Sequence, residues 1–335
     1  MSILEISANS ISSDKITKKY FGDLLTTMWL RPERALMESH MMSVVQKFIP
    51  KSAEKSLEWG CADGSVSFVM LGGEYNFNYD DYLEVEWINN SKKAGSGVNT
   101  DFFDVIADID VNPVKKPSDF IFSNGLSWKQ SHIAKASRLG FHESLHAQDF
   151  NEQLHFPDNY FDFILATNLF WIDNENDLTA ILKDLARVMN INGKIISIFP
   201  QSTNCDFIVA DKLKGADVNW INMLDRGISK NLLYNARDLQ QFEKIAERCG
   251  LRIVNAVSYC PSLISTIYQI GFRPMFPVFM SMYEILKKAS PDKFLDIKKQ
   301  WIDTVSDFMM PLCESKWMME KNLQNTWYCF EFEKI

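Results

Sequence analysis

The stretch Leu57-Glu58-Trp59-Gly60-Cys61-Ala62-Asp63-Gly64-Ser65 decides the fold of this chain. It predicts a short strand that runs into a glycine turn, and the turn opens a helix. Gly60 and Gly64 supply two positions without a Cβ, so the backbone can approach a ligand closely and point helix N-terminal amides at it. A dinucleotide fingerprint requires G-x-G-x-x-G, whereas Ala62 stands at its central position here and the last glycine is missing. The stretch therefore disfavours a nicotinamide or flavin site.

The composition narrows the class of protein. A chain of 335 residues holds one large α/β domain with additions or two small domains, and we favour one domain with an accessory cap. The hydrophobic content of 46% is enough for a sizeable core. A formal net charge of -8 gives no basic footprint, so we expect no nucleic-acid partner.

The cysteines and the N-terminus indicate the compartment. The six cysteines are scattered without a C-x-x-C pair, which indicates reduced, buried thiols and no metal site. Residues 1–13 lack the charged-then-apolar pattern of a secretory signal. No uncharged run approaches the roughly 20 apolar residues that a membrane-spanning helix needs. We therefore expect a cytoplasmic protein.

Two segments compete to form the second strand, 105–111 and 120–128. The first carries Asp108 and Asp110, carboxylates that suit ribose hydroxyl groups. The second fits the register, because a helical pattern over 130–139 and a short strand over 143–148 follow it at the ordinary spacing. We expect the second segment, which offers only the neutral groups of Asn124 or Ser127 at its end and makes residues 72–118 an insertion.

A buried strand follows at 161–166, after a turn at Pro157-Asp158-Asn159. Its C-terminal end lies where open α/β sheets bind ligands. An aromatic side chain there can attract a cation. The candidates to face a ligand and its acceptor at this end are Asn168, Phe170 and Trp171.

These features resemble the class I S-adenosylmethionine (SAM)-dependent methyltransferases, of the methyltransferase type 11 kind. Residues 58–64 resemble motif I, written E-x-G-x-x-x-G, and residues 149–163 resemble the block D-x-x-x-L-P-F-x-D-x-x-F-D. Residues 185–194 resemble the turn L-x-R-V-L-x-P-G-G-x, with Ile191 and Asn192 in place of Pro and Gly. The resemblance implies a doubly wound α/β fold, with a seven-stranded, mostly parallel sheet whose last strand is antiparallel.

The resemblance also implies a cofactor, SAM, and a set of residues to bind it. Asp149 would accept from the adenine amino group, and the Phe150 amide would lie near the ring. Arg31, in N-terminal helices that form a lid, would bind the methionine carboxylate, because its planar fork matches a carboxylate. The full set of candidate cofactor-binding residues is Glu58, Gly60, Cys61, Ala62, Gly64, Asn124, Ser127, Asp149, Phe150, Asn168, Phe170 and Arg31.

Methyl transfer depends mainly on holding the donor and acceptor in line, and a general base helps when the acceptor is a hydroxyl. No pair of residues specifies a nucleophile, a metal site or a hydrolytic triad. No histidine falls at the end of the predicted fourth or fifth strand. His155 and His40 are the histidines that we retain as candidate bases.

The sequence predicts four parts. They are N-terminal lid helices (1–50), a SAM-binding core with the insertion (51–260), a helical acceptor cap (261–322) and the last strand (323–335). The cap region is rich in Met and aromatic residues, a pattern that is more often core than a binding surface. Its place in the acceptor cap is also compatible with an apolar acceptor, a lipid-like substrate or contact with a membrane surface.

We therefore expect a methyltransferase that acts on a small-molecule acceptor. The stretches 29–32 and 271–274 resemble methyltransferases found beside surface-glycan synthesis enzymes, which suggests a sugar or a lipid-linked acceptor. The alternative is an inactive protein of the same fold that binds a partner through its aromatic C-terminal region. The oligomeric state stays open.

Overall fold

The computed structural model describes residues 10–83, 85, 104, 106, 111–117, 120–172, 174–202, 236–272, 275–314 and 324–335. Asp108, Asp110, most of segment 105–111, and residues 273–274 lie outside the described residues. The described strands form one sheet of seven, in the order β3-β2-β1-β4-β5-β7-β6. Their bounds are β1 Ser56–Trp59, β2 Phe122–Ser127, β3 His142–Ala147, β4 Phe161–Ala166, β5 Met189–Pro200, β6 Leu251–Pro261 and β7 Asn325–Lys334.

The sheet confirms the predicted doubly wound, mostly parallel fold. β1 pairs in parallel with β2 and β4, while β7 is antiparallel to both of its neighbours. The segment 120–128 does supply the second strand, with Trp59 opposite Leu126. The sequence pattern predicts that the helix ends at Asn192-Gly193 and that the fifth strand starts at Lys194, which is wrong. Both Asn192 and Gly193 lie within β5, which starts at Met189 and shifts register against β4. The chain therefore passes directly from helix to strand.

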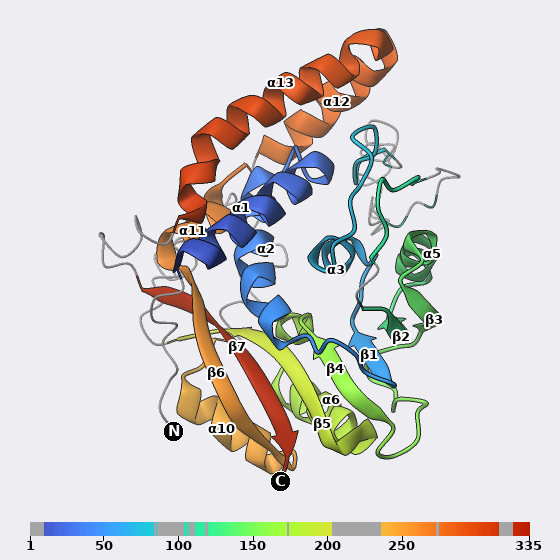
Figure 1. Ribbon diagram of the computed structural model, residues 1–335, viewed down its shortest axis with the longest axis vertical. Coiled ribbons are helices and arrows are strands. Elements are labelled where there is room, and N and C mark those ends of the chain that lie inside the picture. The colour runs from blue at the N-terminus through green and yellow to red at the C-terminus, as the bar shows by residue number, and fades with distance from the viewer. Residues whose placement is uncertain are drawn as a thin grey trace, which may run out of the picture.

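Helices cover both faces of the sheet (Figure 1). On one face, side chains of α1 (Ser10–Thr27), α2 (Pro32–Val45) and α3 (Ser65–Met70) pack against Phe163 and Leu165 of β4. On the other face, α6 (Glu175–Val188) and α10 (Leu239–Arg248) pack against Phe161 and Ile164. A strand buried on both faces needs a nearly continuous apolar run, which is what 161–166 provides.

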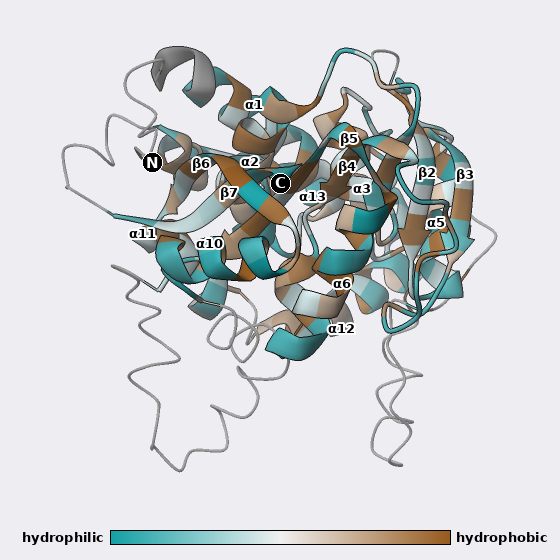
Figure 2. Cartoon of the chain, turned by 90° about the horizontal axis from the view of Figure 1, so that it is seen from below, coloured by the Kyte–Doolittle hydropathy of each residue, from teal (hydrophilic) through white to brown (hydrophobic). Residues whose placement is uncertain are grey.

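The described residues form four further helices, α5, α11, α12 and α13. α5 (Gln130–Leu139) lies between β2 and β3, and α11 (Ser262–Ile270) follows β6. α12 (Phe276–Ala289) and α13 (Pro291–Met309) lie side by side and project away from the sheet in Figure 1. Hydrophilic and hydrophobic residues alternate along α6 and α10 in Figure 2, as expected for helices with one buried face. Three short 3₁₀ turns are η1 (Gln46–Phe48), η3 (Leu169–Trp171) and η6 (Met310–Cys313).

None of the helices in the described ranges is long and apolar enough to cross a membrane.

A buried ion pair joins α13 to the segment that follows α3. We call α12 and α13 together the helical projection. The side chains of Asp80 and Lys298 are both fully inaccessible, with Nζ 3.4 Å from the Oδ2 atom of Asp80. Burial lowers the pKa of Lys298, and the carboxylate of Asp80 opposes that shift. The carboxylate also accepts from Trp29 Nε1 and from the Tyr283 hydroxyl, each at 3.2 Å. The pair therefore ties residues near 80 to the α1–α2 connection, α12 and α13.

Replacing Lys298 by Met should lower the free energy of unfolding by about 3–5 kcal/mol, because it leaves the Asp80 carboxylate buried without its cation. The neighbouring, exposed Lys299 provides a matched control, and Lys299→Met should change the stability by less than about 0.5 kcal/mol. Urea unfolding followed by circular dichroism measures both. Equal effects of the two substitutions would contradict a stabilising role for the pair.

Candidate functional site

The turn between β1 and α3 lies at the carboxyl end of the parallel strands. Gly60 has φ +71° and Gly64 has φ +76°, backbone conformations that L side chains rarely adopt. The Cys61 amide donates to the Leu126 carbonyl at 2.9 Å, and Asn168 Nδ2 donates to the Gly60 carbonyl at 2.5 Å. A Cβ added at Gly60 would lie 3.1 Å from the Cβ of Asn168. The structure thus brings together the predicted residues of the turn and Asn168, which follows β4.

Two backbone amides of this turn, those of Ala62 and Asp63, have no acceptor among the described residues. Ala62 itself has φ +51°, and both residues are half-buried. The neighbouring amide of Ser65 is satisfied, because it donates to Asp63 Oδ1 at 3.0 Å. The turn can therefore offer two adjacent N–H groups to a ligand with hydrogen-bond acceptors.

Asp63 holds a negative charge beside these amides. Burial raises its pKa, but the hydrogen bonds from Ser65 and the charge of Arg34 outweigh that effect and lower the pKa of the carboxyl below its usual value. The Ser65 hydroxyl donates to Asp63 Oδ1 at 2.7 Å. The turn therefore combines two donor amides with one ionised carboxylate.

Glu58, the acid of the motif, lies beneath the turn and is only 3% exposed. One of its carboxylate oxygens accepts from the Ser67 hydroxyl, and the other is 2.7 Å from His142 Nε2. Both oxygens are engaged by the protein, so Glu58 supports the turn from below. It does not present a free oxygen to a ligand.

A hydroxyl stands at the end of β2, next to an imidazole from α5. Ser127 is fully buried, and its Oγ lies 2.9 Å from His132 Nδ1. Asn124 lies further back in the strand, where its Oδ1 accepts from His146 Nε2 at 2.9 Å. Of the two predicted ribose contacts, Ser127 is the one at the carboxyl end of β2.

Aromatic side chains and Asp149 follow the ends of β2 and β3. Trp128 and Phe150 form an edge-to-face pair with ring centroids 6.3 Å apart. Asp149 is exposed, and its Oδ1 accepts from the Asn151 amide at 2.9 Å, which leaves Oδ2 accessible. An exposed carboxylate beside two aromatic rings suits a heteroaromatic ring that carries an amino group.

Phe170 belongs to η3, directly after Asn168. Its ring packs edge-to-face on Trp327 of β7, with centroids 5.1 Å apart, and it contacts both hydrophobic cores of the sheet. Trp171 lies 5.1 Å from it, centroid to centroid. Phe170 therefore has a packing role at the edge of the sheet.

The two arginines at the start of α2 have different surroundings. Arg31 precedes the helix; its Nε pairs with the buried carboxylate of Glu33 and its guanidinium lies 5.4 Å from the Phe276 ring centre. Arg34, one turn later, is 3.7 Å from Glu38, and its charge contributes to the lowered pKa of Asp63. Arg34, which the sequence analysis did not single out, is thus the arginine that interacts with the turn.

The predicted bases lie away from the turn. His155 is exposed in the β3–β4 connection, between Leu154 and Phe156, whose carbonyls both accept from Arg187 near the C-terminal end of α6. That end lies beside the start of β4, at the opposite edge of the sheet from the turn. His40 is 7% exposed in α2, with Nε2 3.3 Å from the Leu312 carbonyl. The structure brings neither histidine to the turn.

His40 should instead make the stability depend on pH. Burial lowers its pKa to about 4, so between pH 6.5 and 4 the unfolded chain binds a proton that the folded chain does not. The stabilisation is therefore complete above pH 6.5 and is lost as the pH falls, by about 3 kcal/mol in total. Urea unfolding at pH 7 and pH 4.5 should show a smaller loss for His40→Gln than for the wild type. His155→Gln is the exposed control and should follow the wild type, whereas equal pH dependence in all three proteins would contradict this assignment.

A carboxyl group that the sequence analysis missed lies next to the ion pair described above. The Asp81 amide donates to the Thr27 carbonyl at 3.2 Å, and its half-buried side chain has no hydrogen-bond partner among the described residues. Burial raises its pKa to about 7, with a further contribution from the charge of Asp63, while Arg34 acts in the opposite direction. A half-buried carboxyl group with a strongly shifted pKa near a glycine turn is a candidate functional residue. Only the fold, by joining α2, the turn and residues near 80, could reveal it.

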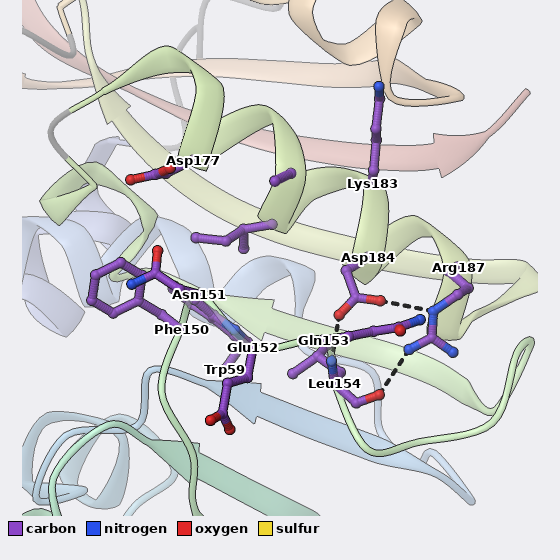
Figure 3. A pocket seen from close by; sticks show the side chains of 12 residues that line it. Trp59, Phe150, Asn151, Glu152, Gln153, Leu154, Asp177, Lys183, Asp184 and Arg187 are labelled. Carbon is purple, nitrogen blue, oxygen red and sulfur yellow. Dashed lines mark hydrogen bonds and ion pairs between the residues drawn. The ribbon is translucent and has the colours of Figure 1, made fainter.

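A cavity of about 390 Å³ lies behind the turn, between the segment 150–154 and α6 (Figure 3). Phe150 and Trp59 form part of its wall. Arg187, at its far end, is already saturated by Asp184, Asp158 and the carbonyls of Leu154 and Phe156. The cavity therefore adjoins the aromatic pair but brings no free cation to it from Arg187. No group of His, Cys, Asp or Glu that could hold a metal occurs in the described ranges.

Comparison with known proteins agrees with this geometry. The family model described as "Methyltransferase domain" matches residues 121–197. No curated protein sequence matches the chain. Among solved structures, the cyclase SpnF is 11% identical with a TM-score of 0.43, and the alignment covers 90% of this chain and 80% of that one.

Two further structures are similar at the same level. A protein from Galdieria sulphuraria described as a sarcosine dimethylglycine methyltransferase is 15% identical, with a TM-score of 0.41 and coverage of 91% of this chain and 82% of that chain. A SAM-dependent methyltransferase from Mesorhizobium loti is 11% identical, with a TM-score of 0.41 and coverage of 87% and 95%. Such scores carry no argument about function. The match to a methyltransferase domain covers residues 121–197, and the strand order agrees with the doubly wound fold that the sequence predicts.

Proposed function

We propose that this enzyme transfers the methyl group of SAM to a small-molecule acceptor beside the β1–α3 turn. The observation that carries the proposal is the pair of amides at Ala62 and Asp63, which have no acceptor among the described residues and lie next to Asn168 at the carboxyl ends of β1 and β4. Open α/β sheets bind their ligands at this edge.

The residues around the turn fit the parts of SAM. The Ala62 and Asp63 amides and the guanidinium of Arg34 can hold the methionine carboxylate, and Asp63 can accept from its ammonium group. The edge-to-face pair of Trp128 and Phe150 offers aromatic surfaces for the adenine ring, with Asp149 as acceptor for its amino group. The ribose position fits less well, because Ser127 is neutral and its hydroxyl is engaged with His132. We expect a weaker ribose contact than an acid would give.

SAM, when bound, supplies a methyl group on a positively charged sulfur. The protein then has to hold an acceptor atom in line with that methyl group, and such positioning can account for about 7–11 kcal/mol of a barrier. Asn168 fixes the turn through the Gly60 carbonyl, which keeps the amides of the turn in place. The main contribution of the protein is therefore to position the methyl donor and the acceptor.

Asp81 is our candidate for the base that receives the acceptor's proton. Its half-buried carboxyl group has a pKa of about 7, which matches a base that works at neutral pH. The acceptor would then carry its methyl group on an oxygen or a nitrogen that loses a proton. The sugar or lipid-linked acceptor expected from the sequence is compatible with this class, with α12 and α13 close to the same segment through Tyr283 and Lys298.

Calorimetry with SAM and with S-adenosylhomocysteine (SAH) tests the cofactor site. We expect a dissociation constant in the micromolar range, which corresponds to a binding free energy of about −8 kcal/mol. Gly60→Val should abolish binding, because φ is positive at this position and the valine side chain would clash with Asn168. Asp149→Ala should weaken binding about tenfold, because it removes the acceptor for the adenine amino group. Glu152→Ala, an exposed neighbour, is the control and should bind as the wild type does.

Folded wild-type protein that binds neither ligand would contradict the proposed enzyme. It would favour the alternative function, a partner-binding protein of the same fold that acts through its C-terminal helices.

Asp81 gives a second test once a screen of hydroxyl and amine compounds has identified an acceptor. The value of kcat/KM should rise with pH through an apparent pKa of about 7 in the wild type, because the base acts in its deprotonated form. Asp81→Asn should remove this step and lower kcat about 100-fold or more, with SAH affinity unchanged. A profile with the same midpoint in Asp81→Asn would rule out Asp81 as the base.

A further inference from the structure

The buried carboxylate of Glu58 closes the β1–α3 turn from inside. Glu58 lies near the end of β1, directly before Trp59, and Ser67 lies in α3. The hydrogen bond between the side chains of Glu58 and Ser67 therefore links the two ends of the turn. The second carboxylate oxygen is held by His142 Nε2 at 2.7 Å. With both oxygens engaged, the carboxylate has no freedom to rotate away from Ser67.

His142 reaches Glu58 from two strands away. It starts β3, the edge strand, yet its side chain is fully inaccessible. Gly125 of β2 lies opposite Glu58 in the sheet register. A Cβ at Gly125 would lie 2.6 Å from His142 Cδ2 and 2.8 Å from its Nε2. The imidazole therefore passes over β2 at the one place along its path where a side chain is absent, and any larger residue there would meet the ring.

The surroundings of His142 indicate that its Nε2 atom carries a proton. The ring stacks on Phe122, with centroids 5.6 Å apart, and lies 4.1 Å from the ring of Phe141. Its Nδ1 is buried and has no hydrogen-bond partner in the part of the chain that the structure describes. A proton on Nδ1 would be a buried donor without an acceptor, which is unfavourable. Nε2 thus donates to Glu58, and Glu58 accepts from both sides.

We propose that His142 is a positioning residue for the SAM-binding turn, acting through Glu58 and Ser67 without touching the ligand. The inference rests on the proposed function. Without the Nε2 donor, the Glu58 carboxylate loses one of its two partners, and the contact with Ser67 that closes the turn is no longer fixed. The turn then populates other conformations, and the apparent ligand affinity falls in proportion to the fraction that remains competent.

The test compares SAH binding by calorimetry with hydrogen exchange of residues 58–67 in the ligand-free protein. His142→Leu should weaken SAH binding about tenfold and speed exchange in the turn, with β5 and β7 unchanged. His142→Gln retains an N–H donor and should stay within about threefold of the wild type. His146→Leu removes another histidine of β3, one that contacts Asn124, and should leave the turn unchanged.

Gly125→Ala provides the sharpest comparison. In the wild type, the new methyl group should displace the imidazole and weaken SAH binding about as much as His142→Leu. In a His142→Ala background, the same methyl group should add less than about a twofold effect, because the ring that it displaces is gone.

Three results would overturn the proposal. They are SAH binding by folded His142→Leu within twofold of the wild type, equal effects of Gly125→Ala in both backgrounds, or exchange in the turn that none of the variants alters. If His142→Leu does not fold, the proposal is still tested by His142→Gln and by Gly125→Ala in the wild-type and His142→Ala backgrounds. Wild-type protein that does not bind SAH contradicts the proposed function, whereas the exchange measurement on ligand-free protein continues to test the role of His142.

Discussion

The constraint on which the rest of this structure depends is the burial of a carboxylate, Glu58, inside a parallel sheet. A buried carboxylate is tolerated only when hydrogen-bond donors surround it, and here the donors come from α3 and from the edge strand β3. Meeting that demand fixes the helix after β1 and the register of β2 and β3 around Gly125. The half-buried turn residues Ala62 and Asp63, whose amides have no acceptor among the described residues, lie above this buried carboxylate.

Two adjacent carboxyl groups, Asp80 and Asp81, have different surroundings, and we assign them different roles. Asp80 is fully inaccessible and is surrounded by donors from Trp29, Tyr283 and Lys298, so it anchors the helical projection. Asp81 has no such donor among the described residues and is half-buried, and burial raises its pKa to about 7. Asp80 anchors the segment that places Asp81 near α2 and the turn, which is why we propose Asp81, and neither histidine, as the base.

The sequence predicted the sheet well because its signals are local. The glycine turn, the apolar run of β4 and the helix–strand spacing after residue 120 each depend on neighbouring residues, and all of them are confirmed. The boundary at Asn192 and Gly193 was misplaced, since a turn-forming pair was read where the strand continues through it. The site was less accessible to prediction. Arg34, Asp81 and His142 acquire their surroundings from segments 18 to 84 residues away, which no local pattern encodes.

The assignment of histidines as bases shows the same limit. A histidine is a reasonable base by chemistry alone, but the position of His155 near the start of β4 and the burial of His40 against Leu312 depend on the whole fold. Conversely, Ser127 does lie at the end of β2, so the neutral group at the ribose position is a property of the folded protein as well as of its sequence.

The most direct measurement of the central claim is a crystal structure of the protein with SAH. The account predicts that the methionine part lies against the amides of Ala62 and Asp63, within reach of Arg34, and that the adenine lies beside Trp128 and Phe150. Density for SAH elsewhere, for example in the cavity between residues 150–154 and α6 with the turn left empty, would contradict the account.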